Sequence, residues 1–314
     1  MASQSFFCKF AARIDNITQL IIMETISNEL LTVGIAEHGA ELQSMMRGGR
    51  EYLWHGDPSY WKRRSPVLFP IVGSVWDGRY RLGGHEYAMS QHGFARDMDF
   101  KCVANDGTEA RFRLESSDES RRLFPCDFVL EIGYRLQGDT LQVLWQVDNP
   151  SAGGEVLHFQ IGAHPAFNYK DYDPEADVQG YFRLDASGDV CDLSLIGEKG
   201  CLKQGKAELA TDGGFLPITR NTFDGDALVL ENSQVHCVEL CDRQRRPYVK
   251  VGFEAPVVGL WSPARGGYAP FVCIEPWYGR CDREHFTGDF GEKDWMQHLQ
   301  PGERFSVSYS ITIL

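Results

Sequence analysis

The sequence predicts an all-β protein, built as one large antiparallel β-sandwich with few short helices. Apolar and polar residues alternate with a period of two along many short segments, which is typical of strands buried on one face. Glycine-containing turns separate these segments, and the 314 residues include 32 glycines. Strands do not alternate regularly with helices, so antiparallel sheets packed face to face are expected rather than a parallel sheet.

The start of the chain differs from the rest. Residues 1–22 are expected to form a leader that is helical or disordered, and Met23 could serve as an alternative start. Residues 23–314 contain no repeat or low-complexity linker and are expected to form a single domain, with the loop-rich stretch 168–225 as an insertion within it. The helical spacing in the leader is that of Phe10, Ile14, Ile17 and Ile21.

Hairpins are predicted where short glycine-containing turns join two alternating segments. The clearest joins Leu130–Leu136 to Leu141–Val147 through Gly138 and Asp139. Others centre on Gly48-Gly49, Gly83-Gly84 and Asn105-Asp106-Gly107. Later strands are predicted over 227–230, 235–240, 248–253, 259–262, 271–274 and 305–313, and a short helix over Glu292–Leu299, ended by Pro301-Gly302.

The composition excludes several classes of protein. The 31 Lys and Arg residues against 44 Asp and Glu residues give a formal net charge of −13, which is too acidic for binding nucleic acid or an anionic membrane through bulk charge. No run of about 18 apolar residues predicts a membrane span. Nine cysteines, an odd number, without a convincing signal peptide favour reduced thiols and a cytoplasmic location.

Titratable residues stand among aromatic residues, glycine and proline in three segments: Gln91–Arg96, Gly162–Asn168 and Ile274–Gly279. His164 and Glu275 each follow a buried-strand pattern and each precede a proline, so both are expected where a strand ends. There they could converge as a general acid and a general base. The structural alternatives are a satisfied core histidine, an edge glutamate paired with an arginine, and, for His92 with Arg96, a braced loop.

At these segments the sequence resembles the aldose 1-epimerase (galactose mutarotase) family, in its branch of mutarotase-like proteins related to hexose-6-phosphate epimerases. Each motif is weak alone, but their order is that of the family, and together they span roughly residues 26–314. The motifs are Pro66–Gly73, Gln91–Arg96, His164–Phe167, Asp226–Leu230, Gly259–Ser262 and Ile274–Trp277.

The resemblance implies a β-supersandwich with a sugar site on one sheet face, and an isomerase that interconverts α and β anomers of an aldohexose or hexose phosphate. Opening the hemiacetal removes a proton from the C1 hydroxyl and adds one to the ring oxygen. Glu275, with an ordinary pKa of about 4.3, is expected to be the ionised base, and His164, with an ordinary pKa of about 6.5, the acid. This chemistry requires no cofactor and no metal.

The same resemblance implies residues that bind the sugar. His92 is expected to contact a sugar hydroxyl or the ring oxygen, and Asp226 to hold sugar hydroxyls. Asp224 competes for the second role because it lies two positions earlier on the same predicted strand face. Arg96 is expected to bind an anion or a hydroxyl, since an arginine here helps to grip the phosphate in hexose-phosphate epimerases.

Two further binding roles are expected. Arg64, with its neighbour Arg63, could supply a second cation, although exposed solvated arginines are an equal alternative. Trp277, with Phe94 and Phe167, could offer apolar faces to sugar C–H groups, although packing alone also explains these aromatic residues.

One departure from the family leaves the substrate open. Many relatives have an arginine directly after the glycine of the Phe-Pro-x-x-Gly run, where this chain has Ser74. The pocket could therefore prefer a different sugar or lack a phosphate grip. The expected partner is a small-molecule sugar or sugar phosphate, with the chain a monomer or weak homodimer.

Three other functions compete with the isomerase. A non-catalytic carbohydrate-binding or sugar-sensing module would use the cleft without a matched acid and base. A glycosidase or lyase is the next alternative, since large β-sandwiches also serve those enzymes. Glycoside hydrolysis normally needs two carboxylates, however, and only Glu275 lies in a recognisable motif. A metalloenzyme is the least expected, because the nine histidines and nine cysteines form no Cys-x2-Cys pair or His-Glu-x2-His run, and Cys237-x3-Cys241 is better explained by packing.

Overall fold

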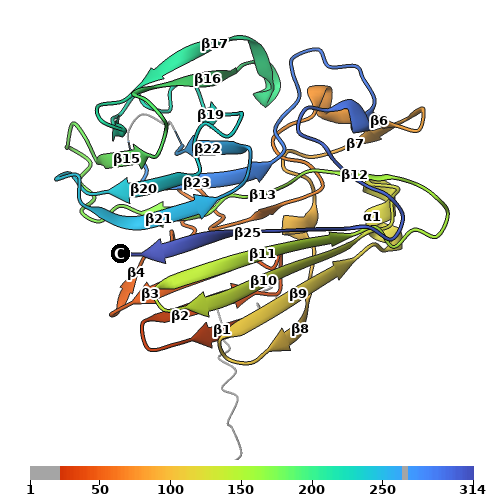
Figure 1. Cartoon of the computed structure of the whole chain (residues 1–314), viewed down its shortest axis with the longest axis horizontal. Helices are drawn as coiled ribbons and strands as arrows, with labels where there is room; N and C mark the ends of the chain where they lie inside the picture. The colour runs from red at the N-terminus through yellow and green to blue at the C-terminus, as the bar shows by residue number, and fades with distance from the viewer. Residues whose placement is uncertain (1–21, 264–267) are drawn as a thin grey trace, which may run out of the picture.

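The structure, a computed structural model, describes residues 22–263 and 268–314. Two large sheets and three smaller ones account for the named strands, and the paired strands within the sheets of the described part run antiparallel (Figure 1). The predicted all-β architecture is confirmed. The predicted leader lies outside the described residues apart from Ile22. None of the helices in the described ranges is long and apolar enough to cross a membrane.

The larger sheet has nine strands and provides most of one wall of the molecule (Figure 1). Its order is β18 (Phe215–Ile218), β15 (Gly180–Leu184), β20 (Cys237–Cys241), β21 (Pro247–Phe253), β25 (Arg304–Ile313), β11 (Thr140–Asp148), β10 (Val129–Gln137), β9 (Glu109–Glu115) and β8 (Lys101–Asn105).

The second sheet has eight strands and carries the candidate site. Its order is β17 (Leu202–Ala210), β16 (Val190–Ile196), β19 (Leu228–Leu230), β22 (Val257–Trp261), β23 (Phe271–Tyr278), β13 (Ile161–Ala163) and β5 (Val67–Leu68), and β14 (Ala166–Asn168) also pairs with β23.

Smaller elements complete the described chain. The only α-helix in the described ranges is α1 (Asp118–Leu123), which Ser117 begins with a capping box. One small sheet has four strands in the order β1 (Met23–Ser27), β2 (Leu31–Ala36), β3 (Leu42–Arg47) and β4 (Arg50–Glu51). The other two small sheets are strand pairs, β6 (Arg79–Leu82) with β7 (His85–Ala88) and β12 (Leu157–Phe159) with β24 (Gln297–Leu299). The 3-10 turns are η1 (Trp76–Gly78), η2 (Ala95–Asp97), η3 (Glu198–Gly200) and η4 (Phe290–Glu292).

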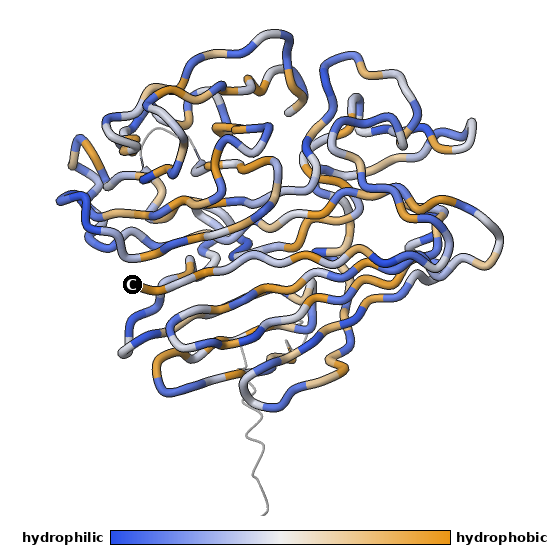
Figure 2. Tube along the Cα trace, viewed as in Figure 1, coloured by the Kyte–Doolittle hydropathy of each residue, from blue (hydrophilic) through white to orange (hydrophobic). Residues whose placement is uncertain are grey.

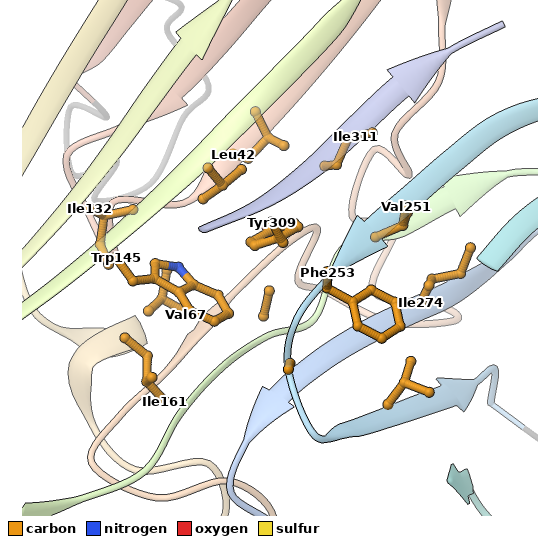
Figure 3. Packing of buried hydrophobic residues seen from close by; sticks show 14 of the residues in the cluster. Leu42, Val67, Ile132, Trp145, Ile161, Val251, Phe253, Ile274, Tyr309 and Ile311 are labelled. Carbon is orange, nitrogen blue, oxygen red and sulfur yellow. The ribbon is translucent and has the colours of Figure 1, made fainter. Parts of the chain in front are cut away.

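The core forms because alternate residues of each strand face inward. On β11 the buried residues are Leu141, Val143, Trp145 and Val147, with half-buried residues between them. Figure 2 shows hydrophobic and hydrophilic stretches interleaved along the strands. Residues from both large sheets meet in the interior, where Trp145 and Tyr309 of one sheet lie near Ile161 and Ile274 of the other (Figure 3).

Strand β23 presents different residues on its two faces. Val272 and Ile274 belong to the main core cluster, whereas Cys273 and Trp277 belong to two separate clusters. Because side chains alternate along a strand, Glu275 lies on the same face as Cys273 and Trp277. The face opposite the main core therefore carries the carboxylate expected in the site.

All four predicted hairpins are confirmed. The pair β10–β11 turns at Gly138 and Asp139, and the other three turns join β3 to β4, β6 to β7 and β8 to β9. The predicted C-terminal strand forms as β25, and it lies at the centre of the larger sheet between β21 and β11.

The predicted helix over Glu292–Leu299 is wrong. Asp289 caps only the single turn η4. Trp295 then takes a positive φ of 60°, which ends any helix, and residues 297–299 pair with β12 as strand β24. Cross-strand partners far away in the sequence override the local preference for a helix.

The stretch 168–225 is not a loop-rich insertion. It supplies β15 and β18 to the larger sheet and β16 and β17 to the second sheet. These strands contain exposed or half-buried residues, and β17 has four exposed residues in a row, so they lack the continuous apolar runs that mark buried strands. The stretch is therefore an integral part of both sheets.

Candidate active site

The sheet register places His164 directly opposite Glu275. Strands β13 and β14 both pair with β23, with Gly162 opposite Trp277 and Ala166 opposite Cys273. The two pairings share one register, which runs through the short gap between β13 and β14. Side chains opposite each other in antiparallel strands lie on one face, and His164 Nε2 is 3.3 Å from Glu275 Oε2.

Two prolines make this arrangement compatible with a sheet. The chain leaves the ladder at His164 and Pro165, between β13 and β14. The backbone N–H of Ile274 donates to Pro165 O at 3.3 Å. Alternate residues of a strand direct their N–H groups to the same neighbour, so Pro276, which has no N–H, faces the gap where β13 ends. Glu275 thus lies within β23 and not at its end, which corrects the sequence prediction, while His164 does follow the end of β13.

His164 and Glu275 line a cavity of about 250 Å³ on this face of the second sheet. Strands β13, β22 and β23 form its floor, and the segments before η2, around η3 and before β19 form its walls. The cavity-lining residues are Trp61, Gly73, Gln91, His92, Arg96, His164, Ile196, Gly200, Asp226, Ala227, Trp261, Glu275, Trp277 and Cys281.

The carboxyl group of Glu275 is buried without adequate partners. The residue is 1% exposed, and its Oε2 has no hydrogen-bond partner. Burial raises the pKa of Glu275 well above its ordinary value, and the nearby charge of Asp226 raises this pKa further. The indole of Trp277 opposes the rise, although its Nε1 is not in hydrogen-bond geometry with any acceptor.

The imidazole of His164 is enclosed by aromatic rings. Trp61 stacks on it with ring centroids 4.7 Å apart and planes at 27°, and Trp261 meets it edge-on at 5.4 Å. Burial, together with the positive charges of Arg96 and Arg63, lowers the pKa of His164 to about 3. Its Nδ1 has no hydrogen-bond partner.

These pKa directions reverse the ionisation states expected from free side chains. Burial favours a neutral carboxyl on Glu275 and a neutral imidazole on His164 over a carboxylate and an imidazolium. Both arrangements hold one transferable proton and one proton acceptor in the pair. The pair can therefore donate one proton and accept another in either arrangement.

A hydrogen bond from the backbone fixes which ring nitrogen of His92 can donate. The backbone N–H of Gly73 donates to His92 Nδ1 at 3.1 Å, so Nδ1 is unprotonated and Nε2 carries the hydrogen of the neutral ring. Burial and the neighbouring His164 lower the pKa of His92 well below its ordinary value. The following Gly93 is required, because a Cβ there would lie 2.1 Å from Phe69 O.

Arg96 brings positive charge to the cavity. Its Nη2 donates to Gln91 O at 2.6 Å, while its buried Nε has no partner. Burial and the charge of Arg63 lower the pKa of Arg96 to about 10, so it stays protonated at neutral pH. Asp97 lies between the two arginines, with Oδ2 3.8 Å from Arg96 Nε and Oδ1 2.8 Å from Arg63 Nη2.

Asp226, and not Asp224, reaches the cavity. Asp226 takes a positive φ of 75° just before β19, and its Oδ1 accepts a hydrogen bond from Ala227 N at 2.7 Å. Asp224 instead accepts from Asn221 on the exposed loop and does not line the cavity. The loop geometry thus distinguishes the two carboxylates that sequence reasoning left open.

Trp277 lies between two glycines that leave it room. A Cβ on Gly162 would lie 2.6 Å from Trp277 Cδ1, and one on Gly259 would lie 2.4 Å from Trp277 Cη2. Both glycines stand on strands that flank β23. Their missing side chains let the indole lie flat against the floor of the cavity, where it presents an apolar surface.

Phe94 and Phe167, expected as apolar sugar contacts, belong to the main core cluster and do not line this cavity. Arg64 also lies elsewhere. Its Nη1 donates to Gln43 O at 2.8 Å, and its backbone N–H donates to Glu41. It lines a separate cavity of about 450 Å³ with His38, His55 and others. The side chain of Arg63 points to the Asp97 side instead, so the second cation near the site is Arg63.

Ser74 stands beside the η3 turn. A Cβ on Gly200 would lie 3.1 Å from Ser74 Oγ, and Gly200 itself lines the cavity. A longer side chain at position 74 would need the space that η3 occupies. The short side chain of Ser74, where many relatives have an arginine, therefore leaves the space in which η3 lies.

The residues that sequence reasoning missed include Trp61 and Trp261, which line the cavity, and Cys273, which lies beside it. Trp261 and Cys273 have a signal, because the period of two places them on the face of β22 or β23 that carries the site. Trp61 has none, since it lies in an irregular segment after Asp57 and Pro58. Cys273 also completes a group with His164 and Glu275 whose potential metal-binding atoms lie within 4.8 Å of one another.

Comparisons with known proteins agree with this geometry. A sequence model described as Aldose 1-epimerase matches residues 23–312. Protein LacX (chromosomal) of Lactococcus lactis subsp. lactis is 29% identical over 308 residues, which cover 92% of this chain and 98% of that protein.

Solved structures show the same fold. A galactose mutarotase related enzyme from Lactobacillus acidophilus is 32% identical with a TM-score of 0.86, covering 93% of this chain and 97% of that one. A galactose mutarotase-like protein from Lactobacillus casei ATCC 334 is 30% identical with a TM-score of 0.85, covering 93% and 100%. The fold, the ordered motifs and the match along nearly the whole described chain lead to one assignment: the chain belongs to the aldose 1-epimerase family.

Proposed function

We propose that this protein is a mutarotase, which interconverts the α and β anomers of an aldohexose or hexose phosphate. The observation that carries the proposal is the cross-strand pair of His164 and Glu275, whose facing atoms are 3.3 Å apart in one cavity. Membership of the aldose 1-epimerase family supports an isomerase that acts on carbohydrates. A cytoplasmic location and a monomeric or weakly dimeric state stay predictions.

The reaction needs the two functions that such a pair can supply. From the ion-pair arrangement, Glu275 accepts the proton of the C1 hydroxyl while His164 donates a proton to the ring oxygen, which leaves the pair neutral. The bond between C1 and the ring oxygen breaks, and a C1 carbonyl forms. Rotation of about half a turn about C1–C2 presents the other carbonyl face, and closure with the roles exchanged gives the second anomer. Atoms and charge balance without oxidation or reduction.

Burial of the pair favours this exchange of roles. Because desolvation disfavours both charged forms, burial moves the balance of the pair from the ion pair toward the neutral pair. A pair that holds one proton in either arrangement is ready for the forward and the reverse step. Ordinary pKa values would instead favour the ion pair and make opening the slower half.

The remaining groups of the cavity are assigned to binding. His92 Nε2–H donates to a sugar oxygen, Asp226 accepts from sugar hydroxyls, and Trp277 contacts the C–H groups of the ring. Arg96, with an unpartnered Nε, donates to a hydroxyl or to a phosphate. Asp97 partly neutralises Arg96 and Arg63, so this site fits a neutral sugar as well as a phosphorylated one.

The test is anomer exchange, followed by polarimetry or NMR saturation transfer. Fresh α-glucose, α-galactose and glucose 6-phosphate should be compared with wild-type protein and the Glu275→Gln variant, against a buffer blank. The proposal predicts acceleration for at least one sugar, which Glu275→Gln abolishes while sugar binding stays nearly intact, because the amide keeps the shape and removes the base. Binding without acceleration for every sugar would favour a sugar-sensing module instead.

A further inference from the structure

A cysteine adjoins the acid–base pair and has no part in the mechanism above. Cys273 lies on β23 two residues before Glu275, so both side chains point to the same face of the strand. It is 0% exposed and packs with Trp54, Ala166 and Phe271. Its thiol therefore lies on the same face of β23 as the carboxyl group of Glu275, next to the cavity but not in its lining.

His164, Cys273 and Glu275 together offer the donor set of a metal site. An imidazole nitrogen, a thiol sulfur and a carboxylate oxygen lie within 4.8 Å of one another. A tetrahedral zinc ion, with bonds of about 2.0–2.1 Å to nitrogen and oxygen and about 2.3 Å to sulfur, holds its ligands roughly 3.3–3.6 Å apart. The His164 Nε2 to Glu275 Oε2 distance of 3.3 Å already matches, and the Cys273 sulfur lies within 4.8 Å of both atoms.

The unmet hydrogen-bonding capacity of the trio points to a ligand. Glu275 Oε2 and His164 Nδ1 are buried and have no hydrogen-bond partner, although the two residues are only 1% and 7% exposed. A buried polar atom without a partner costs free energy. A cation bound between His164 Nε2 and Glu275 Oε2 would give this unpartnered carboxyl oxygen a partner.

We propose that His164, Cys273 and Glu275 form a binding site for a borderline-soft divalent cation such as Zn²⁺, and that the bound ion inhibits the enzyme. Mixed nitrogen, oxygen and sulfur donors select zinc over magnesium or calcium. Three protein ligands leave a fourth position, which opens to the cavity for water or a sugar hydroxyl. Binding displaces the thiol and carboxyl protons to solvent.

The inhibition, unlike the binding, rests on the proposed acid–base role of the pair. A metal ion on Glu275 and His164 occupies the lone pairs that must accept and donate protons in ring opening. Cys273 touches neither proton in that mechanism, so a Cys273→Ser variant separates metal binding from catalysis. Cys281 also lines the cavity but stands outside the trio, and its serine variant is the matched control.

The experiment titrates metal-free protein with Co²⁺ and records the cobalt–thiolate charge-transfer absorbance, then measures anomer exchange with and without Zn²⁺. Wild type and Cys281→Ser should both give the band, and Cys273→Ser should lose it and bind cobalt weaker by at least the roughly 10–100-fold typical of a disturbed metal site. Cys273→Ser should also retain anomer exchange in the presence of zinc that stops the wild type.

Each outcome decides one part of the proposal. A cobalt band that survives in Cys273→Ser, or no band in the wild type, would overturn the site. A band without zinc inhibition in an active enzyme would overturn the inhibitory role. Should the protein anomerise no sugar, the cobalt band still tests the site, since it requires no turnover. Cys273→Ala replaces the serine variant if the hydroxyl at this buried position prevents folding.

Discussion

Two buried glutamates on the second sheet behave in opposite ways. Glu231 follows β19 and is 8% exposed, and Glu275 lies within β23 and is 1% exposed. Glu231 accepts hydrogen bonds from Ser194, Trp295 and Arg280. Burial acts to raise the pKa of Glu231, but these partners outweigh it and leave that pKa below its ordinary value. Glu275 has no comparable partners, and its pKa is raised.

The contrast shows that partners, and not burial alone, decide the role of a buried carboxyl group. The Glu231 group is a closed ion-pair network, because Arg280 also binds Asp294, which in turn binds Arg283. Such a network stabilises one structure. The pair of Glu275 and His164 lines a cavity instead, so it can exchange protons with a bound substrate.

The largest effect is expected from removing the acid of this pair. His164→Asn keeps a polar side chain of similar reach but cannot carry the proton, so anomer exchange should slow by about 10²–10⁴-fold. Stopped-flow polarimetry at saturating sugar measures this loss. A His164→Asn variant with the wild-type rate would refute the role of His164.

Breaking the closed network should act on stability instead. Arg280→Met leaves the buried Glu231 without its cation, while the half-buried Asp294 keeps Arg283, and this should lower the free energy of unfolding by about 3–5 kcal/mol. Chemical denaturation measures this loss. The folded fraction of the variant should still anomerise sugar at the wild-type rate, and a large loss of kcat in folded protein would place Arg280 in the reaction.

The two glutamates should also differ in the sign of their pH linkage. Glu231 has a lowered pKa, so its contribution is present above the unfolded pKa of about 4.3 and is lost as the pH falls through the folded value. Glu231→Gln should therefore cost about 1.5–3 kcal/mol at pH 7, and less near pH 4.

Glu275 has a raised pKa, so its charged form destabilises the fold as the pH rises above about 4.3. Glu275→Gln should be at least as stable as wild type at pH 7, with the difference vanishing near pH 4. Thermal unfolding of both variants across this pH range measures the two signs. Equal signs would contradict the comparison.

The smallest effect concerns the ring that stacks on His164. Trp61→Leu removes an aromatic contact worth about 0.5–1.5 kcal/mol, which corresponds to about 2- to 10-fold in kcat. Trp61→Phe should restore most of the loss, because it keeps a ring against the imidazole. Equal rates for all three proteins would show that Trp61 only covers the site.

The sequence predicts the strands and hairpins well because they depend on local alternation and turn chemistry. It also singles out His164 and Glu275, because each immediately precedes a proline. It does not predict that they face each other, since this depends on one register shared by two strands across a gap. For the same reason it misplaces Arg64, whose neighbour Arg63 points the other way.

Two further features depend on contacts that are distant in sequence. Within residues 292–299, where a helix was predicted, residues 297–299 form a strand because they pair with β12, about 140 residues earlier in the chain. The pKa directions of Glu275 and His164 depend on which groups surround them in space, so these directions do not follow from the ordinary values of the free side chains. Local patterns contain neither kind of information.

The central claim is that His164 and Glu275 act as one acid–base unit. Anomer exchange should be measured for His164→Asn, Glu275→Gln and the double variant, with Glu231→Gln as the matched control. If the pair is one unit, the double variant loses no more rate than the slower single variant, because either substitution already disables the unit. Losses that multiply in the double variant, or a single variant at the wild-type rate, would contradict the claim.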